Sequence, residues 1–262
     1  GDWEGAVIPV SNDDARLTYV ASNITLSLNQ TAVDLDSLRV TPTNTGHIAS
    51  AGASLIISAD LFVYGGSGNC YWASGNTTSD YLIVNTDNKG ATAFNMTGGT
   101  VTLAVCRKGG INFSGGTQTT LIVSYRDDPD NDVILDIGTG ATTTTLIVRA
   151  GRVTLHNAPG TAVYQDGGYI NWIDTTGTCA LFRQSAGTCD WNPGASTVTK
   201  MEIAGILRCG TTNLGKIATN VDALPGSEIY AEFMPPSVFP GGIRDFGAKV
   251  MRAPVGSVIS YT

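Results

Sequence analysis

Hydrophobic and polar residues alternate in four short stretches between residues 150 and 210, and each stretch follows a glycine. The glycines recur at nearly constant intervals, at Gly151, Gly168, Gly187 and Gly205. Alternation with a period of two predicts a β-strand that buries one face. One such strand every ~18 residues predicts a solenoid in which each coil adds a strand to a parallel sheet. The predicted fold is all-β: a single-stranded, right-handed parallel β-helix.

Equivalent positions in the four stretches form columns. The second and fourth residues after each glycine are predicted to point into the core: Val153, Ile170, Cys189 and Leu207, then Leu155, Trp172, Trp191 and Cys209. The residues between them are predicted to face outward: Arg152, Tyr169, Thr188 and Ile206, then Thr154, Asn171, Asp190 and Arg208. We expect the two tryptophan rings to stack in the core; facing outward, they would instead form a sugar-binding platform. The same phase recurs upstream after Gly99, at Val101 and Leu103.

Upstream of these coils, several stretches are apolar at successive positions rather than at alternate ones. Residues 81–84, 120–123 and 145–148 each contain three consecutive Leu, Ile or Val residues. Such runs are typical of parallel strands that are covered on both faces. The second cover is either a neighbouring subunit or a tight inner corner of the coil, and the pattern leaves both open.

The pattern divides the chain into three parts. Residues 1–22 hold an apolar run and a polar turn, and we predict that they form an N-terminal arm. Residues 23–221 carry the strand pattern of the β-helix, and we expect three short strands separated by polar turns between residues 23 and 40. Residues 222–262 contain five of the ten prolines, and proline cannot donate a hydrogen bond to a sheet. This segment is therefore expected to cap the solenoid or to pack on a neighbouring chain.

Composition and charge narrow the set of partners. The chain has 262 residues, of which 42% are hydrophobic and 14% charged, and a formal net charge of −7. A negative net charge argues against a nucleic-acid partner and against an anionic membrane surface. The sequence has no run of about 18 apolar residues that would predict a membrane span, and its first residues lack the pattern of a signal peptide.

The five cysteines, Cys70, Cys106, Cys179, Cys189 and Cys209, include no CxxC pair. Three of them lie in or near the apolar columns, so we interpret them as small buried hydrophobes of a protein made in a reducing compartment. A disulfide between the stacked neighbours Cys189 and Cys209 is the alternative. A zinc site is not expected, because only two histidines are present to complete one.

Residues that could carry chemistry are sparse. The acidic run 127–132 matches the start of a calcium loop, but its glycine and closing acidic residue are missing, which favours a solvated turn. Glycoside hydrolysis needs two converging carboxylates, whereas the outward columns contain only Asp190. Asp174 is the nearest second acid, and Arg208 is more simply an ion-pair partner of Asp190. We therefore predict that the protein is not an enzyme, and we assign no catalytic residue, cofactor or metal.

The N-terminal part of the chain carries a pattern that runs from Asp2-Trp3 through Pro9, Asp13-Asp14 and the segment 32–40 to Thr45-Gly46-His47-Ile48. This pattern resembles the opening of a β-helical family encoded in tailed-bacteriophage genomes, and similar openings occur in large bacterial surface proteins. The resemblance implies a virion structural protein, in particular a capsid decoration (cement) protein. Such a protein would sit as a homotrimer on the outer capsid surface, bind the major capsid protein and stabilise the head. It would be made in the host cytoplasm and reside on the virion.

A protein of this kind acts through surfaces, and the two irregular ends are the regions expected to make contacts. We predict subunit or capsid contacts at Trp3, Val7, Ile8 and Val10, and at Phe233, Phe239 and Phe246. Two other classes stay open. A phage tailspike or fibre domain that binds or cleaves surface polysaccharide would need paired carboxylates in a groove, and a bacterial surface adhesin would need a secretion signal.

Overall fold

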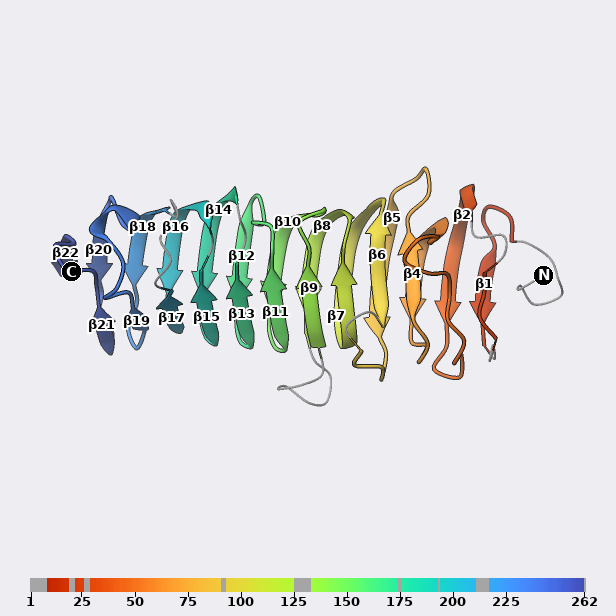
Figure 1. The fold of residues 1–262 in the computed structure, drawn as a ribbon, viewed down its shortest axis with the longest axis horizontal. Helices are drawn as coiled ribbons and strands as arrows, with labels where there is room; N and C mark the ends of the chain where they lie inside the picture. The colour runs from red at the N-terminus through yellow and green to blue at the C-terminus, as the bar shows by residue number, and fades with distance from the viewer. Residues whose placement is uncertain are drawn as a thin grey trace.

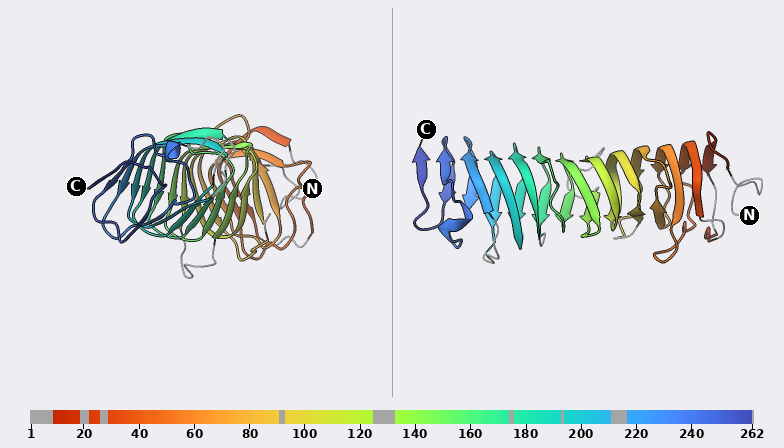
Figure 2. Two further views of the ribbon diagram at one scale, coloured as in Figure 1. Left: turned by 60° about the vertical axis from the view of Figure 1, so that its left-hand side comes forward. Right: turned by 90° about the horizontal axis from the view of Figure 1, so that it is seen from above.

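The computed structural model describes residues 9–18, 22–25, 29–90, 93–124, 133–173, 176–192, 194–210 and 217–261. These residues form an elongated parallel β-solenoid whose coils stack along a single axis (Figure 1). The first and last strands, Asp14–Leu17 and Ile259–Tyr261, lie at opposite ends of this axis (Figures 1 and 2). The structure therefore confirms the parallel β-helix that the alternation and the glycine spacing predict.

Two ladders of parallel strands run along the solenoid. The first ladder consists of β1 (Asp14–Leu17), β2 (Asn29–Val40), β3 (Leu55–Tyr64), β5 (Ser79–Asn85), β7 (Thr100–Phe113), β8 (Gly116–Val123), β10 (Ala141–Val148), β12 (Ala162–Gln165), β14 (Thr176–Gln184), β16 (Ala195–Ile203), β18 (Ile217–Ala223), β20 (Ile243–Asp245) and β22 (Ile259–Tyr261). The second ladder consists of β4 (Cys70–Ala73), β6 (Phe94–Gly98), β9 (Val133–Ile137), β11 (Arg152–Leu155), β13 (Tyr169–Trp172), β15 (Thr188–Trp191), β17 (Ile206–Cys209), β19 (Glu228–Tyr230) and β21 (Val250–Arg252). The long strand β7 belongs to both ladders, because its end pairs with β6 and β9. A short 3₁₀ turn, η2 (Pro236–Val238), lies between β19 and β20.

A corner within the long strands of the first ladder gives each coil three sides. In β8, Gln118 and Leu121 are buried, but Thr119 and Thr120 between them are not. The buried phase shifts in the same way in β10 between Thr143 and Leu146. We name the part of the first ladder before this corner side A, the part after it side B, and the second ladder side C.

The register of side C confirms the predicted columns. Each glycine-led strand pairs with the next in the alignment that the columns require, from Val153 through Ile170 and Cys189 to Leu207. Trp172 pairs with Trp191, and both side chains are fully buried. The tryptophans are therefore part of the core and do not form an exposed sugar-binding platform.

Three of the four glycines, Gly151, Gly168 and Gly187, turn the chain from side B to side C in a left-handed backbone conformation. Gly168 has a φ of +66° and Gly187 a φ of +84°, and residues that carry a Cβ avoid this region. A Cβ atom on Gly187 would lie 2.5 Å from the carbonyl oxygen of Gly168 in the coil beneath. The buried side chain of Gln165 also binds this turn, because its amide donates to the carbonyl oxygen of Thr188 at 2.9 Å. Close stacking of successive turns thus explains the recurring glycines.

The glycine pattern fails at one upstream position. Gly99 has a φ of +80° as expected, and Val101 is buried. Leu103 lies beyond the corner, however, so it faces outward on side B and its neighbour Ala104 is buried instead. The prediction for Leu103 is wrong because a period of two does not continue through a corner.

At the N-terminal end, the ladder begins earlier than the expected boundary. Strand β1 lies inside residues 1–22, the expected arm, and pairs in register with the second half of β2. Strand β2, with 12 residues, joins the second and third of the three expected short strands. Most of the first lies outside the described residues, and its Ile24 forms a single bridge to Ile48. Its polar residues Asp36 and Ser37 lie at the corner, where a polar pair interrupts the apolar pattern without ending the strand.

At the C-terminal end, the ladder continues past residue 221. Strand β18 pairs with β20 and β20 with β22, while β19 pairs with β21, so residues 222–261 add coils to the solenoid. The prolines of this segment lie in the connections, outside the strands. Proline is tolerated there because no ladder hydrogen bond requires its missing N–H.

Replacing Gly187 by Ala should lower the free energy of unfolding by at least about 1–2 kcal/mol, because the residue keeps a positive φ and its new Cβ meets the stacked backbone. Urea unfolding followed by circular dichroism measures the change. Gly160→Ala is the matched control, because no atom lies within 4 Å of its Cβ position. Equal stability of Gly187→Ala and the wild type would contradict the role given to this turn.

Candidate functional site

The predicted contact residues fall into three groups. Trp3, Val7 and Ile8 lie outside the described residues. Val10 and Phe233 are 63% and 73% exposed, and Phe246 lies partly exposed beneath the guanidinium of Arg244, 5.8 Å from the ring centre. The structure thus leaves these three side chains accessible to a partner.

Phe239 differs from the other predicted contact residues. It is 3% exposed, and its ring centre lies 6.5 Å from that of Trp191. Phe239 therefore belongs to the hydrophobic core of the last coils and is not available for contact with another chain. A count of aromatics in a proline-rich segment could not distinguish it from Phe233, because both lie in irregular connections.

The outward column of side C holds an ion pair between coils. Arg208 lies 3.8 Å from Asp190, as the sequence predicts, and the hydroxyl of Tyr169 donates to the other carboxylate oxygen of Asp190 at 2.5 Å. Burial and this hydrogen bond raise the pKa of Tyr169 to about 12. The other potential acid, Asp174, lies outside the described residues. The carboxylate of Asp190 is therefore bound by Arg208 and Tyr169, and in the described part of this column no second acid lies beside it.

Metal ligation has no geometric support within the described residues. No three His, Cys, Asp or Glu side chains among them are grouped so that they could hold a metal ion. The acidic run 127–132, the candidate calcium loop, lies outside the described residues. Nε2 of His156 lies 3.1 Å from a carboxylate oxygen of Asp136, which belongs to the outward column of side C.

Side B carries an outward column that is apolar over six consecutive coils. The ladder register aligns Val63, Ile83, Val105, Ile122, Ile147 and Tyr164. All six are partly exposed. In the sequence, this column is indicated only by the continuous apolar runs. Those runs do not show whether a subunit or an inner corner covers their second face.

A pair of arginines lies at the N-terminal end of the same column. Arg16 of β1 pairs with Arg39 of β2, and both side chains are exposed. They line a pocket of about 470 Å³ together with Thr41, Pro42 and Asn85. No carboxylate in the described part of the chain forms an ion pair with either guanidinium. Sequence reasoning missed this pair, because the two arginines are distant in the sequence and only the register brings them together.

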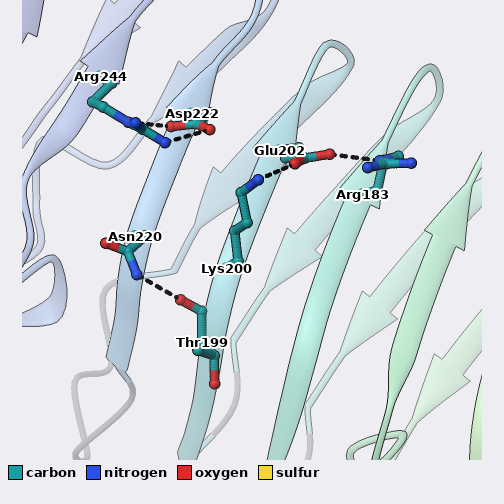
Figure 3. Close-up of polar contacts among 7 residues, drawn as sticks. All are labelled: Arg183, Thr199, Lys200, Glu202, Asn220, Asp222 and Arg244. Carbon is teal, nitrogen blue, oxygen red and sulfur yellow. Dashed lines mark hydrogen bonds and ion pairs between the residues drawn. The ribbon is translucent and has the colours of Figure 1, made fainter.

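The C-terminal end of the column is charged and internally paired (Figure 3). Glu202 accepts a hydrogen bond from Arg183 in the coil beneath at 2.5 Å and another from Lys200. Asp222 forms a bidentate ion pair with Arg244, at 2.7 and 2.8 Å. Side B therefore passes from arginines that have no ion-pair partner in the described part of the chain, through an apolar stretch, to a network of ion pairs.

The bonds to Glu202 affect its titration. Its side chain is 14% exposed. The hydrogen bonds from Arg183 and Lys200 hold the pKa of this carboxyl below its ordinary value of 4.5. A carboxyl with a lowered pKa stabilises the folded state above its unfolded pKa, and this contribution is lost as the pH falls through the folded value.

All five cysteines are buried and none forms a disulfide. Cys189 pairs across the ladder with Leu207, and Cys209 with Trp191, so the alternative of a Cys189–Cys209 disulfide is wrong. Burial raises the pKa of Cys70, Cys106 and Cys189. The cysteines act as small core residues, which confirms that part of the prediction.

Comparisons with known proteins add no relative: no family model matches the chain, no curated protein is similar to it, and no solved structure matches it. Within the described ranges, no helix has the length and apolar character that crossing a membrane requires.

Replacing Glu202 by Gln should lower the free energy of unfolding by about 1 kcal/mol at pH 7, because two charge-assisted hydrogen bonds are weakened. The difference from the wild type should shrink as the pH falls below 4.5, where the carboxyl of the unfolded chain becomes protonated, and should be lost once the pH passes the lowered pKa of the folded state. Urea titrations at several pH values measure it. Asp87→Asn is the control: its ion pair with Lys108 is at the surface, with Asp87 79% exposed, so it should change stability by less than about 0.5 kcal/mol. A pH-independent effect of Glu202→Gln would contradict the assignment.

The cysteines should not react with Ellman's reagent in the native protein. Their thiols are buried, and a thiol with a raised pKa is a poor nucleophile. In guanidinium chloride all five should react, which supplies the internal control. Rapid reaction of any cysteine in the folded protein would show that the core opens locally.

Proposed function

We propose that this protein is a non-enzymatic structural protein of a virion: a capsid decoration protein that binds the outer capsid surface and stabilises the head. The observation that favours this proposal is the state of the outward columns in the described coils. Their charged groups on side C and at the C-terminal end of side B are engaged in ion pairs between coils, and the neighbouring carboxylates Glu202 and Asp222 are each held by a cation. Such a surface suits contact with other proteins better than bond cleavage. The resemblance of the N-terminal pattern to the phage family points in the same direction.

The proposed partners are the major capsid protein and further copies of the same chain, assembled as a homotrimer. The proposed capsid contacts lie at the ends of the solenoid. At the C-terminal end, Phe233, Val255, Val258 and Tyr261 are each at least 73% exposed. Exposed apolar side chains gathered at one end of a rod are typical of a protein contact. The N-terminal arm is the second proposed contact.

Co-sedimentation tests the proposal. The purified chain is mixed with capsids of the phage whose genome encodes it, assembled without it, and the capsids are then heated. We expect the chain to sediment with the capsids and to raise the temperature at which they dissociate. Failure to bind, or a gene that lies outside any phage genome, would contradict the proposal. Cleavage of a surface polysaccharide that Asp190→Ala abolishes would instead support a tailspike.

Two variants test the contact surface in the same assay. Removal of residues 1–8, which leaves β1 intact, and Phe233→Ser should each weaken capsid binding at least about tenfold, as expected when an interface anchor is lost. Thr142→Ser, an exposed change on side A, is the matched control and should bind as the wild type does. Full binding by both variants would place the contact elsewhere on the solenoid.

A further inference from the structure

The apolar column of side B is unusual when it is compared with the equivalent column of side C. Over the same six coils, the outward column of side C holds polar residues at every position after Tyr71: Asn95, Asn112, Asp136, Thr154 and Asn171. Both columns belong to parallel strands of one solenoid, so strand propensity alone does not explain the difference. A second outward column of side B adds Leu61, Leu103 and Tyr81, the last of which is 52% exposed. A half-covered apolar face of this length is suited to contact with another surface.

The size of side B is adequate for a stable contact. Its thirteen strands, spaced about 4.8 Å apart, form a face about 58 Å long, and four residues of strand span about 13 Å. This corresponds to roughly 750 Å², close to the ~800 Å² that each partner buries in a standard interface. A partner of matching length would therefore cover side B from its acidic edge to the apolar column.

The two edges of side B carry opposite charges at the N-terminal coils. At the corner between sides A and B, Asp36, Asp60 and Asp80 lie on three successive coils, all exposed. Partial desolvation and the neighbouring carboxylates Asp34, Asp80 and Asp36 raise the pKa of Asp60. The opposite edge is the column that is apolar in the later coils, and it begins with Arg16 and Arg39, beside Thr41 and Pro42. Within the described residues, none of these three acids or two arginines has an ion-pair partner of opposite charge.

We infer that a second copy of this chain packs on side B, parallel to the first, with the acidic edge of one copy against the arginine edge of the next. Rotation about an axis along the solenoid brings opposite edges together at equal heights, whereas antiparallel packing brings like edges together. The acids occupy β2, β3 and β5 and the arginines β1 and β2, so the two sets overlap in height. Both charge clusters and the apolar column would thus find partners in one contact. This inference rests on the proposed self-association, not on capsid binding.

The oligomeric state tests the inference. Light scattering coupled to size-exclusion chromatography should give an oligomer for the wild type and a single chain for Ile122→Glu, with Val105→Lys as the second variant. Thr154→Glu is the matched control, because it places the same charge on the outward column of side C, and it should remain oligomeric. Circular dichroism establishes that each variant folds. A monomeric wild type, or an oligomer that Ile122→Glu and Val105→Lys leave intact, would overturn the inference. Capsid binding is measured separately, so failure of self-association and failure of the proposed function can be distinguished.

Charge reversal tests the edges. Arg39→Asp should weaken self-association at least about tenfold, because it opposes like charges across the contact. Adding Asp36→Arg to this variant should restore assembly, because Asp36 lies on the same strand as Arg39 and the polarity of the edge pair at that height is then exchanged. No loss with Arg39→Asp, or no recovery in the double variant, would contradict the pairing of these edges.

Cysteine cross-linking tests the orientation. Val63→Cys and Tyr164→Cys lie at opposite ends of the apolar column, and the native cysteines are buried and do not compete. In parallel packing, Val63→Cys lies at the height of its own equivalent, so a short bismaleimide should cross-link this variant to itself. Cross-linking of Val63→Cys only to Tyr164→Cys in a mixture, or to neither, would overturn parallel packing.

Discussion

Every coil of this solenoid has to place its strands directly over those of the coil beneath, because a buried backbone group without a hydrogen-bond partner is costly. This stacking determines the sequence requirements of each position. An inward residue has to fill one layer of the core between fixed neighbours, as Trp172 does between Leu155 and Trp191. A turn has to approach the turn beneath it within backbone contact, which Gly187 allows. The glycine spacing is the visible consequence of the stacking.

The same constraint organises the surface into columns. Side chains that face outward from successive strands lie about 4.8 Å apart, so each residue is held against its equivalents in the coils above and beneath. Opposite charges at such a distance form ion pairs, as Glu202 and Arg183 do. Like charges at this distance repel one another. Asp36, Asp60 and Asp80 are nevertheless stacked on three successive coils. The composition of a column therefore indicates whether the solenoid completes it internally or leaves it for a partner.

Much of the fold could be predicted from the sequence, because alternation within strands and recurrence between them are both local signals. The core positions of Cys189, Trp172 and Trp191 follow from these signals alone. The predictions failed where a local signal has two meanings. Proline excludes a residue from a sheet but not from the loops of a coil, and residues 222–261 therefore continue the ladder. Polar residues inside β2 mark a corner and not a turn, and for this reason one strand resembled two in the sequence.

The sequence by itself determined which residues of each strand point inward, since side chains in any β-strand alternate between its two faces with a period of two. Only the tertiary structure decided which outward residues lie side by side. Equivalent positions are unevenly spaced, because the stretch of chain between Val105 and Ile122 is much shorter than that between Ile122 and Ile147. Because the connections differ in length, no fixed repeat in the sequence shows which residues are aligned. The hydrogen bonds between coils determine that alignment in the folded chain. For this physical reason the apolar column of side B, the paired arginines and the acidic edge became visible only in the folded solenoid.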